Sequence, residues 1–535
     1  MKYFIAFCFA LFIKVIETKA QEPFKYSVKI DSIQLSGLPG IHSFAFAEHE
    51  GKWLIIGGRT DGLHPRQPFA SFPESENNTE IYVVDIENQQ VWSAELNSLP
   101  TSINEQLQSS NMNFYQDADT LVLIGGYCYS QSAATHKTFP NLTTINVSGL
   151  INAIVNNTDI TPFFKQITDP IFAVTGGELS KLNELYYLVG GQRFDGEYNP
   201  MGHPTYVQTY TDAIQKFTIN NNGMELSFAN YQKITDPIHL HRRDFNLLSH
   251  IFPDGNEGLV ISSGVFQKYV DLPFLYPVEI SGSDYVARTT FNQYLNNYHT
   301  AHANIYDSLE NKMTSLFFGG ISQYYYVDGA LYQDDLVPFV NTISGITRDN
   351  TGNLVEFYIP GGMPGFKGSS SEFLPNYNLS SKHSEILKET LFEGDTITIG
   401  YILGGISSPT KNPFSMNQTN RTAADKNIYI VKLFPAAPNT IKTIHVPNPY
   451  TMEIFPNPTT AEFTIKFNVT SKVAARYFIT NNSGALLQSN QIEITQPGDV
   501  VYNVVLDKSF TLQNLIVTLV IDNTYYISKS LVLQE

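Results

Sequence analysis

The chain carries a small-residue doublet six times, each directly after a run of β-branched, aromatic or other apolar residues. The doublets are Gly57-Gly58, Gly125-Gly126, Gly190-Gly191, Ser263-Gly264, Gly319-Gly320 and Gly404-Gly405. They stand 56 to 85 residues apart, and a recurring unit of this size is typical of repeat architectures. Runs such as Leu121–Ile124 are short, apolar and closed by glycine, which favours buried strands over helices. The sequence therefore predicts an all-β repeat fold.

The first unit shows what one repeat contains. Its alternating segments predict four strands, at residues 42–46, 53–58, 81–86 and 91–96. Gly57, Gly58, Tyr82 and Trp92 resemble the kelch repeat, in which a Gly-Gly doublet is followed by a Tyr and then a Trp. The other five units keep only the doublet and a following strand. The resemblance implies a six-bladed kelch-like β-propeller over residues 21–435, with four-stranded sheets around a central channel.

The last repeat lacks an outer strand. Its strands are predicted near residue 386, at 397–404 and at 428–433, after which the chain reaches Pro435. The alternating segment 26–35 at the other end has no partner. We expect this N-terminal segment to complete the last sheet, because closing the ring removes two exposed strand edges.

The first twenty residues predict export. Lys2 precedes the apolar stretch 4–13, and Ala20 stands before Gln21, a pattern typical of a secretory signal peptide over residues 1–20. No later segment has the roughly eighteen consecutive apolar residues that a membrane span needs. We therefore expect a secreted protein that does not span a membrane.

Charge and cysteine content exclude some functions. The formal net charge of −17 argues against nucleic acid and against an anionic membrane surface. Cys8 leaves with the signal peptide, so Cys128 remains without a disulfide partner and is expected to be a buried, inert thiol. Copper radical oxidases combine a kelch propeller with a β-sandwich, but the surroundings of Cys128 show no match to that family.

From Pro449 the pattern changes to a second set of alternating strands, after a predicted linker at 436–448. The motif Phe455-Pro456-Asn457-Pro458 and the ending Tyr526–Leu533 resemble the C-terminal sorting domain of Bacteroidetes proteins exported by type IX secretion. The chain departs from that family at Leu515–Val517, where a Gly-Tyr pair is usual.

The resemblance implies that residues 449–535 form a small Ig-like β-sandwich with Pro456, Asn457 and Pro458 as its sorting motif. The partner would be the type IX secretion machinery, and the protein would reach the outer cell surface or the medium. An ordinary accessory sandwich is the alternative.

Long polar loops are predicted between the second and third strands of every repeat. These loops should emerge on the same face as the connections between repeats, and long loops on a rigid scaffold are where binding usually resides. Aromatic, Arg, Asp and His residues in these segments suit sugar or peptide recognition. The candidate binding residues are Arg59, His64, Arg193, His203, His239, His241, Arg242, Arg243, Tyr298, His299, His302, Tyr325 and Asp328.

Two functions compete. The first is a secreted or cell-surface binding protein for glycan or protein, with no cofactor and no reaction. The alternative is an extracellular metal-dependent enzyme, an oxidase, lyase or hydrolase acting on carbohydrate, in which one transition metal is held by His239, His241, His299 and His302. Convergence of these four histidines on one point would favour the enzyme.

Overall fold

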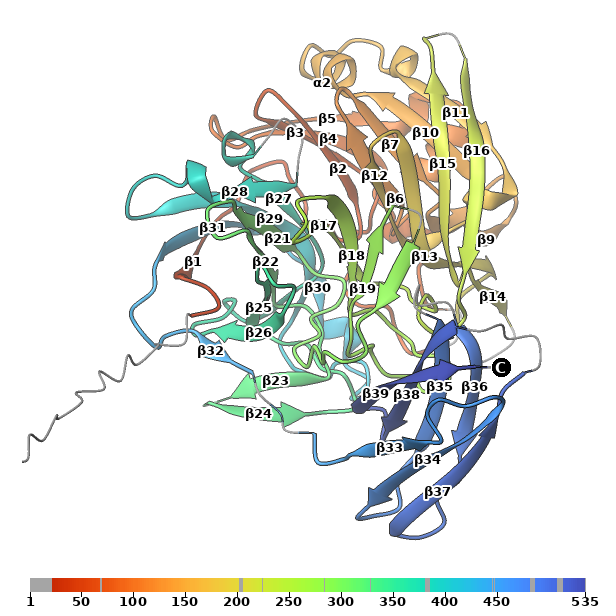
Figure 1. Cartoon of the computed structure of the whole chain (residues 1–535). Helices are drawn as coiled ribbons and strands as arrows, with labels where there is room; N and C mark the ends of the chain where they lie inside the picture. The colour runs from red at the N-terminus through yellow and green to blue at the C-terminus, as the bar shows by residue number, and fades with distance from the viewer. Residues whose placement is uncertain are drawn as a thin grey trace, which may run out of the picture.

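The computed structural model describes residues 22–534, apart from 68–69, 202–204, 224, 283, 328, 381–384, 445, 447, 482–485 and 508–512. The predicted signal peptide, His203 and Asp328 therefore lie outside the described residues. Nearly every described element is a strand (Figure 1). No helix in the described part of the chain is long and apolar enough to cross a membrane.

The chain up to Pro435 forms six units, each built around four antiparallel strands. Unit 1 is β2 (Ala45–His49), β3 (Lys52–Ile56), β4 (Glu80–Asp85) and β5 (Gln90–Glu95). Unit 2 is β6 (Asn113–Asp117), β7 (Thr120–Ile124), β10 (Asn141–Asn146) and β11 (Phe164–Thr168). Unit 3 is β12 (Thr175–Leu182), β13 (Leu185–Gly196), β15 (Ala213–Asn221) and β16 (Leu226–Thr235).

The other three units repeat this order. Unit 4 is β17 (Asn246–Ile251), β18 (Glu257–Ser262), β19 (Val278–Ser281) and β20 (Asp284–Ala287). Unit 5 is β21 (His302–Asp307), β22 (Lys312–Phe318), β25 (Ile343–Arg348) and β26 (Leu354–Ile359). Unit 6 is β27 (Phe366–Pro375), β29 (Ile397–Ser408), β31 (Ile428–Pro435) and β1 (Tyr26–Ile33). The first strand of every unit lines one central cavity, so the arrangement is propeller-like.

Additional strands and helices decorate the units. Added strands are β8 (Tyr127–Ser130), β9 (Thr135–Thr138), β14 (Tyr206–Tyr210), β23 (Tyr324–Val327), β24 (Ala330–Gln333), β28 (Ile386–Lys388) and β30 (Ala423–Ala424). Two short α-helices lie in units 1 and 2, α1 (Thr101–Leu107) and α2 (Val147–Val155). Short 3-10 turns lie at Glu74–Glu76, Leu96–Ser98, Thr161–Phe163, Pro170–Phe172, Tyr377–Leu379, Glu389–Leu391 and Thr419–Arg421.

The ring closes through the N-terminal strand. β1 pairs antiparallel with β31, with Tyr26 opposite Pro435 and Ile33 opposite Ile428. The N-terminal segment therefore supplies the outer strand of unit 6, which confirms the prediction from the sequence.

The doublets link each unit to the next. The N–H of Gly58 donates to Ser109 O at 2.9 Å, that of Gly126 to Val174 O at 3.1 Å, and that of Gly191 to Arg242 O at 2.8 Å. Gly320 and Gly405 make the same bond to Lys367 O and Ile41 O, both at 2.8 Å. The doublet recurs because the backbone N–H of its second residue donates the hydrogen bond to the next unit.

The first doublet residue must be small. A Cβ on Gly125 would stand 1.8 Å from Val174 O, and φ at this residue is +69°. Only glycine meets both conditions without strain. Unit 4 departs from the pattern, and there the Ser263 hydroxyl donates instead to Asn296 O at 2.7 Å.

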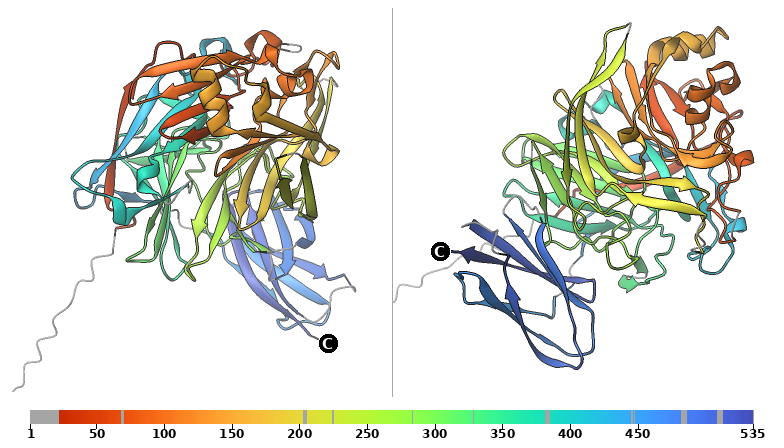
Figure 2. Two further views of the ribbon diagram at one scale, coloured as in Figure 1. Left: turned by 90° about the horizontal axis from the view of Figure 1, so that it is seen from above. Right: turned by 90° about the vertical axis from the view of Figure 1, so that its right-hand side faces the viewer.

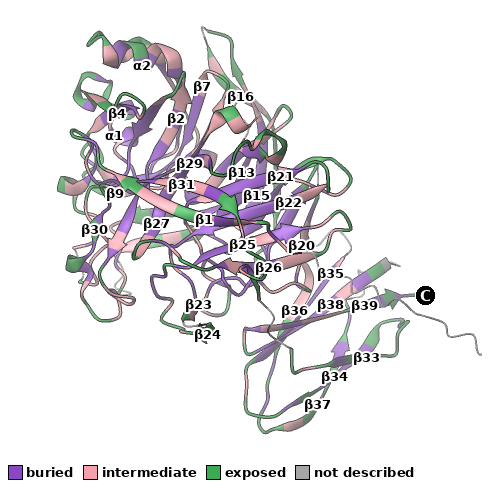
Figure 3. Ribbon diagram, turned by 90° about the vertical axis from the view of Figure 1, so that its left-hand side faces the viewer, coloured by how far each residue is buried: buried purple, intermediate pink, exposed green. Residues whose placement is uncertain are grey.

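Apolar strand faces fill the space between neighbouring units. Leu54 and Ile56 of unit 1 pack with Leu121 and Leu123 of unit 2 in one buried cluster. Figure 3 shows buried residues concentrated in the strands of the units and exposed ones in the connections. Burial of the strands from both sides explains their nearly continuous apolar sequence.

The C-terminal residues form a separate two-sheet unit. One sheet is β33 (Met452–Phe455), β34 (Glu462–Val469) and β37 (Gly498–Val505). The other is β35 (Ala475–Asn481), β36 (Leu486–Ile492), β38 (Gln513–Ile521) and β39 (Tyr525–Leu533). The segment predicted as a linker runs along unit 5, where β32 (Lys442–Thr443) pairs with β26 and Ile444 N–H donates to Glu356 O at 2.8 Å.

The doublets generate a prediction about stability. Gly125→Ala should lower the free energy of unfolding by about 2 to 4 kcal/mol, because the new Cβ displaces the unit 3 backbone in addition to straining φ. Gly255→Ala is the matched control, since φ there is +84° and nothing lies within 4 Å of the added Cβ. It should cost only about 1 kcal/mol. Thermal unfolding of both variants checks this, and equal losses would contradict it.

Candidate functional site

The unit connections and the loops between second and third strands emerge on one face, which we call the loop face. Backbone bridges join the two sets, pairing His42 with Arg59 and Arg243 with Val265. The prediction that these segments share a face is confirmed.

Six connecting residues at the loop face form a ring around the channel, which we call the mouth ring. Its members, all with positive φ between 46° and 63°, are Ser43, Asn111, Gly176, Asp244, His299 and Ser370. Backbone N–H groups link successive members, from Asn111 to Ser43 O at 3.0 Å and from Asp244 to Gly176 O at 2.8 Å. Five non-glycine residues in this conformation store strain, a feature that concentrates at functional sites.

Polar side chains of the mouth ring converge on the channel. Ser43, Asn111, Asp244 and His299 line one cavity below the ring. His299 Nδ1 lies 3.3 Å from Ser370 Oγ and 3.8 Å from Asp244 Oδ1. Asn111 Oδ1 is buried and has no hydrogen-bond partner within the described chain.

Arg243 stands beside the ring with unused donors. Its side chain is only 12% exposed, and its Nε is 3.7 Å from Asp244 Oδ2 but has no hydrogen-bond partner among the described residues. The guanidinium lies 5.1 Å from the Phe266 ring centroid. Burial opposes its charge, yet nearby tyrosines and Asp244 hold the pKa of Arg243 above its usual value. Those tyrosines are Tyr198, Tyr210 and Tyr298.

His241 positions one of these tyrosines. Its ring stacks on Tyr210 with centroids 3.9 Å apart, and its Nδ1 lies 2.6 Å from Asp212 Oδ1. Burial raises the pKa of Tyr210 and of Tyr298, so both phenols stay neutral hydrogen-bonding groups at physiological pH. The predicted residues His241, Arg243, Tyr298 and His299 are thus brought together.

His64 belongs to an aromatic cluster on the same face. Its ring lies 5.4 to 5.6 Å from the rings of Phe72, Tyr198 and Phe414. Burial lowers the pKa of His64 to about 4, and the charge of Arg243 adds to this effect. Arg59 is buried beside the cluster and paired with Asp61 at 2.8 Å. We interpret Arg59 as a residue that holds the loop rather than one that meets a ligand.

Other predicted residues lie elsewhere. Arg193 is exposed and paired with Asp195 at 2.8 Å. Tyr325 lies in the β23–β24 hairpin, with Lys411 Nζ 4.1 Å from its ring centroid. His239 and Arg242 are buried where the C-terminal unit meets unit 4.

The four candidate metal-binding histidines have separate surroundings. His239 Nδ1 bonds Tyr276 OH at 2.9 Å, His241 pairs with Asp212, His299 adjoins Ser370, and His302 lines the channel. The described residues contain no group of three or more His, Cys, Asp or Glu side chains placed to hold one metal ion. The convergence that would have favoured the metal-dependent enzyme is not found.

Cys128 is a buried thiol. It is 1% exposed, and Sγ lies 3.6 Å from Ser109 Oγ. Burial raises the pKa of Cys128 to about 12, so the reactive thiolate is not populated at neutral pH.

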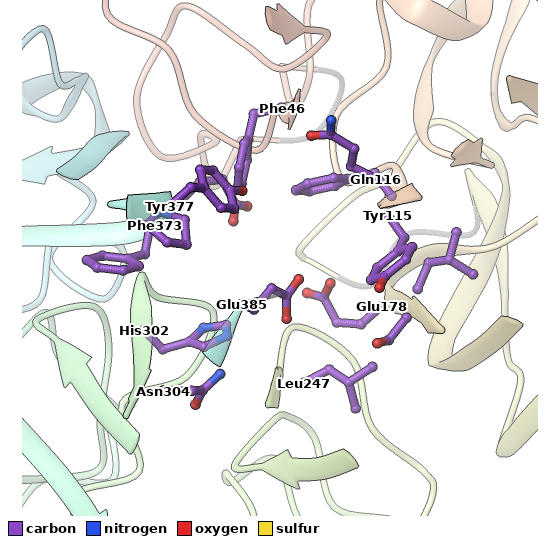
Figure 4. A pocket seen from close by; sticks show the side chains of 15 residues that line it. Phe46, Tyr115, Gln116, Glu178, Leu247, His302, Asn304, Phe373, Tyr377 and Glu385 are labelled. Atoms are coloured by element: carbon purple, nitrogen blue, oxygen red, sulfur yellow. The ribbon is translucent and has the colours of Figure 1, made fainter. Parts of the chain in front are cut away.

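Deeper in the channel lies an inner chamber that sequence reasoning missed (Figure 4). It is lined by Glu178, Glu372 and Glu385 together with His302 and several aromatic rings. Figure 4 shows the carboxyl groups of Glu178 and Glu385 pointing toward one another. Glu385 accepts a hydrogen bond from Ser249 Oγ at 2.8 Å.

Burial raises the pKa of all three carboxyl groups. The pKa of Glu372 rises to about 8, with the charge of Glu385 adding to the effect of burial. The pKa of Glu178 lies well above its usual range for the same reasons. Glu178 and Glu372 each lie in the first strand of a unit, but these strands also carry Ser and Lys, so the sequence offers no clear signal for the chamber.

Comparisons with known proteins include two solved structures of low sequence identity. No protein-family model matches the chain, and no curated protein matches it. A solved structure of YjhT is 11% identical, with a TM-score of 0.41, covering 77% of this chain and 99% of that one. Sucrose-6-phosphate hydrolase from Lactobacillus gasseri is 9% identical, with a TM-score of 0.25, covering 96% and 89%.

The raised pKa values in the inner chamber should make the stability of the fold depend on pH. A carboxyl group whose pKa is raised on folding stabilises the fold below its unfolded pKa, and that contribution is lost as pH rises through the folded value. Wild type should therefore lose stability between pH 4.5 and about 8. Glu372→Gln should remove roughly 1 to 4 kcal/mol of this loss. Thermal unfolding across this range checks it. Glu184→Gln, at a side chain 93% exposed, should behave as wild type, and parallel curves for all three proteins would contradict the assignment.

Proposed function

We propose that the protein is a secreted or cell-surface binding protein that takes a glycan or protein ligand at the mouth of a six-bladed kelch-like propeller. The observation that carries this proposal is the convergence of Arg243, Tyr298, His299 and Asp244 at the mouth ring. Arg243 and Asp244 come from one connection between units, and Tyr298 and His299 come from the next, so the site forms only when these connections are brought together by folding.

A glycan is the ligand class that this chemistry favours. Sugar rings present apolar faces that pack on aromatic side chains, and hydroxyls that pair with charged and polar groups. The mouth offers Tyr210 and Tyr298 as aromatic groups beside the donors and acceptors of His299, Asp244 and Asn111. Protein loops with similar polar side chains are the other ligand class.

Arg243 is the proposed anchor. Its Nε donor is buried without a partner in the described chain. A buried donor that makes no hydrogen bond costs about 1 to 3 kcal/mol of stability. A ligand carboxylate, sulfate or pair of hydroxyls would satisfy it, and the guanidinium fork suits bidentate pairing. We therefore expect acidic glycans to bind more tightly than neutral ones.

The C-terminal unit is proposed to be an Ig-like sorting domain that engages the type IX secretion machinery. Its Pro456-Asn457-Pro458 motif packs on the last strand, where Asn457 Nδ2 donates to Ser530 O at 2.7 Å and Asn457 Oδ1 accepts from Val532 N–H at 2.9 Å. Together with the predicted signal peptide, this motif supports an extracellular or outer cell-surface location.

A carbohydrate-active enzyme is the second candidate. The raised pKa of Glu372 and the facing carboxyl groups of Glu178 and Glu385 are the observation that favours it. A carboxylic acid kept protonated beside an ionisable partner can act as general acid in glycoside cleavage. This version of the enzyme needs no histidine cluster.

The binding proposal predicts that Arg243→Met weakens the strongest ligand found on glycan and peptide arrays by about 10- to 100-fold, since a charge-assisted pair contributes about 1.5 to 3 kcal/mol. Titration calorimetry of residues 21–535 measures the change. Arg193→Met is the matched control, because Arg193 is exposed and, among the described residues, pairs with Asp195, and it should bind within about twofold of wild type. Equal affinity for Arg243→Met and wild type would reject the mouth as the site.

A further inference from the structure

The inner chamber adjoins the cavity below the mouth ring. Phe114, Glu178 and Glu372 line both spaces, whereas His302 and Glu385 line the chamber alone. The first strands of the six units surround the chamber, so it lies at the centre of the ring. A small molecule that passes the mouth ring therefore meets the chamber next.

Three carboxyl groups face the chamber with few partners. Glu178 and Glu372 accept no hydrogen bond from a described residue, and Glu385 accepts one from Ser249 Oγ at 2.8 Å. None of the three belongs to an ion pair in the part of the chain that the structure describes. Burial opposes their charge, and Glu385 adds repulsion at Glu178 and Glu372. A cation placed among them would relieve both effects, because an opposite charge favours the ionised form.

Asn304 of β21 supplies an independent sign of a ligand. Its side chain is 1% exposed, and its Oδ1 accepts from Ser315 Oγ at 2.8 Å. Its amide lines the chamber (Figure 4), and its Nδ2 donates to none of the described residues. Buried polar groups nearly always have a hydrogen-bond partner, so an unused amide donor here calls for an acceptor inside the chamber. A hydroxyl or carbonyl oxygen of a ligand is such an acceptor.

Aromatic rings from several units enclose these polar groups. Figure 4 shows Phe46 of unit 1, Tyr115 of unit 2 and Phe373 of unit 6 around the chamber, together with Tyr377, which follows β27. Burial raises the pKa of Tyr115 and of Tyr377, so both hydroxyls stay neutral. Aromatic faces attract cations and also pack on the apolar faces of sugar rings. The chamber therefore suits a ligand that carries both a positive charge and a ring.

The donors and acceptors of the chamber favour an organic cation over a metal ion. The described residues hold no group of three or more His, Cys, Asp or Glu side chains arranged for one metal. An ammonium group has three N–H donors on a compact charge and needs no fixed coordination geometry. An amino sugar carries such a group together with hydroxyls for Asn304 and a ring for the aromatic walls.

We propose that the inner chamber binds an amino sugar with a free ammonium group. The ammonium group donates to the carboxyl groups of Glu178, Glu372 and Glu385. A hydroxyl accepts from Asn304 Nδ2, and the sugar ring packs on the aromatic walls. This site is separate from the one proposed at the mouth, where the charge of Arg243 favours acidic ligands. No bond is made or broken, so the proposal holds for a chain without enzymatic activity.

Titration calorimetry of residues 21–535 with glucosamine tests the proposal. The C-terminal unit is kept because Phe478 and Tyr526 share an apolar cluster with Tyr276 of unit 4 (Figure 2). Glucosamine should bind with one equivalent and at least about 10-fold more tightly than N-acetylglucosamine, which keeps the ring but has no charge. No binding of glucosamine, or equal affinity for the two sugars, would overturn the proposal.

Two variants locate the bound sugar. Glu178→Gln keeps the shape of the side chain but removes its charge, so it should weaken glucosamine binding by about 10-fold. Glu184→Gln is the matched control, because that side chain is 93% exposed, and it should bind as wild type does. Thermal unfolding of each variant checks that it is folded. Unchanged affinity in Glu178→Gln would place the sugar outside the chamber and overturn the proposal. Failure of acidic glycans to bind at the mouth would leave the glucosamine result unaffected, so the two proposals fail separately.

Discussion

The hydrogen bond from each small-residue doublet to the next unit holds the ring together. Five backbone N–H groups and the Ser263 hydroxyl make these bonds at 2.7 to 3.1 Å, and the β1–β31 pairing closes the circle. Because the first glycine of the five Gly-Gly doublets lies against a neighbouring carbonyl, a side chain there would push two units apart. The doublet is therefore a packing requirement that repeats with the fold.

The same bonds place the mouth. Each doublet contacts the connection that carries the next member of the mouth ring, so these bonds fix where the six left-handed residues lie relative to the units. Arg243 and Asp244 of one connection then meet Tyr298 and His299 of the next. The binding chemistry depends on closure of the whole ring, and long loops add aromatic groups around it.

Sequence patterns predicted the backbone better than the site. The doublets, the four strands of unit 1 and the closing strand 26–35 follow from local periodicity and edge pairing, and the structure contains them within a few residues. His299, Arg243 and Tyr298 were found because they lie in connections. Glu178 and Glu372 were missed because their meeting depends on which residue of an inner strand faces the channel, and Glu385 because it reaches the chamber from the segment just before β28. Arg242 was assigned to binding, but its burial under the C-terminal unit depends on long-range docking that no local pattern shows.

Amide hydrogen exchange, followed by mass spectrometry on residues 21–535, tests most directly whether the doublets hold a closed ring. If they do, the doublet peptides should exchange slowly and together with the β1 strand, as one cooperative opening. These peptides contain Gly58, Gly126, Gly191, Gly320 and Gly405. Exchange of these five peptides at independent rates, or a β1 strand that exchanges freely while the doublets stay protected, would contradict it.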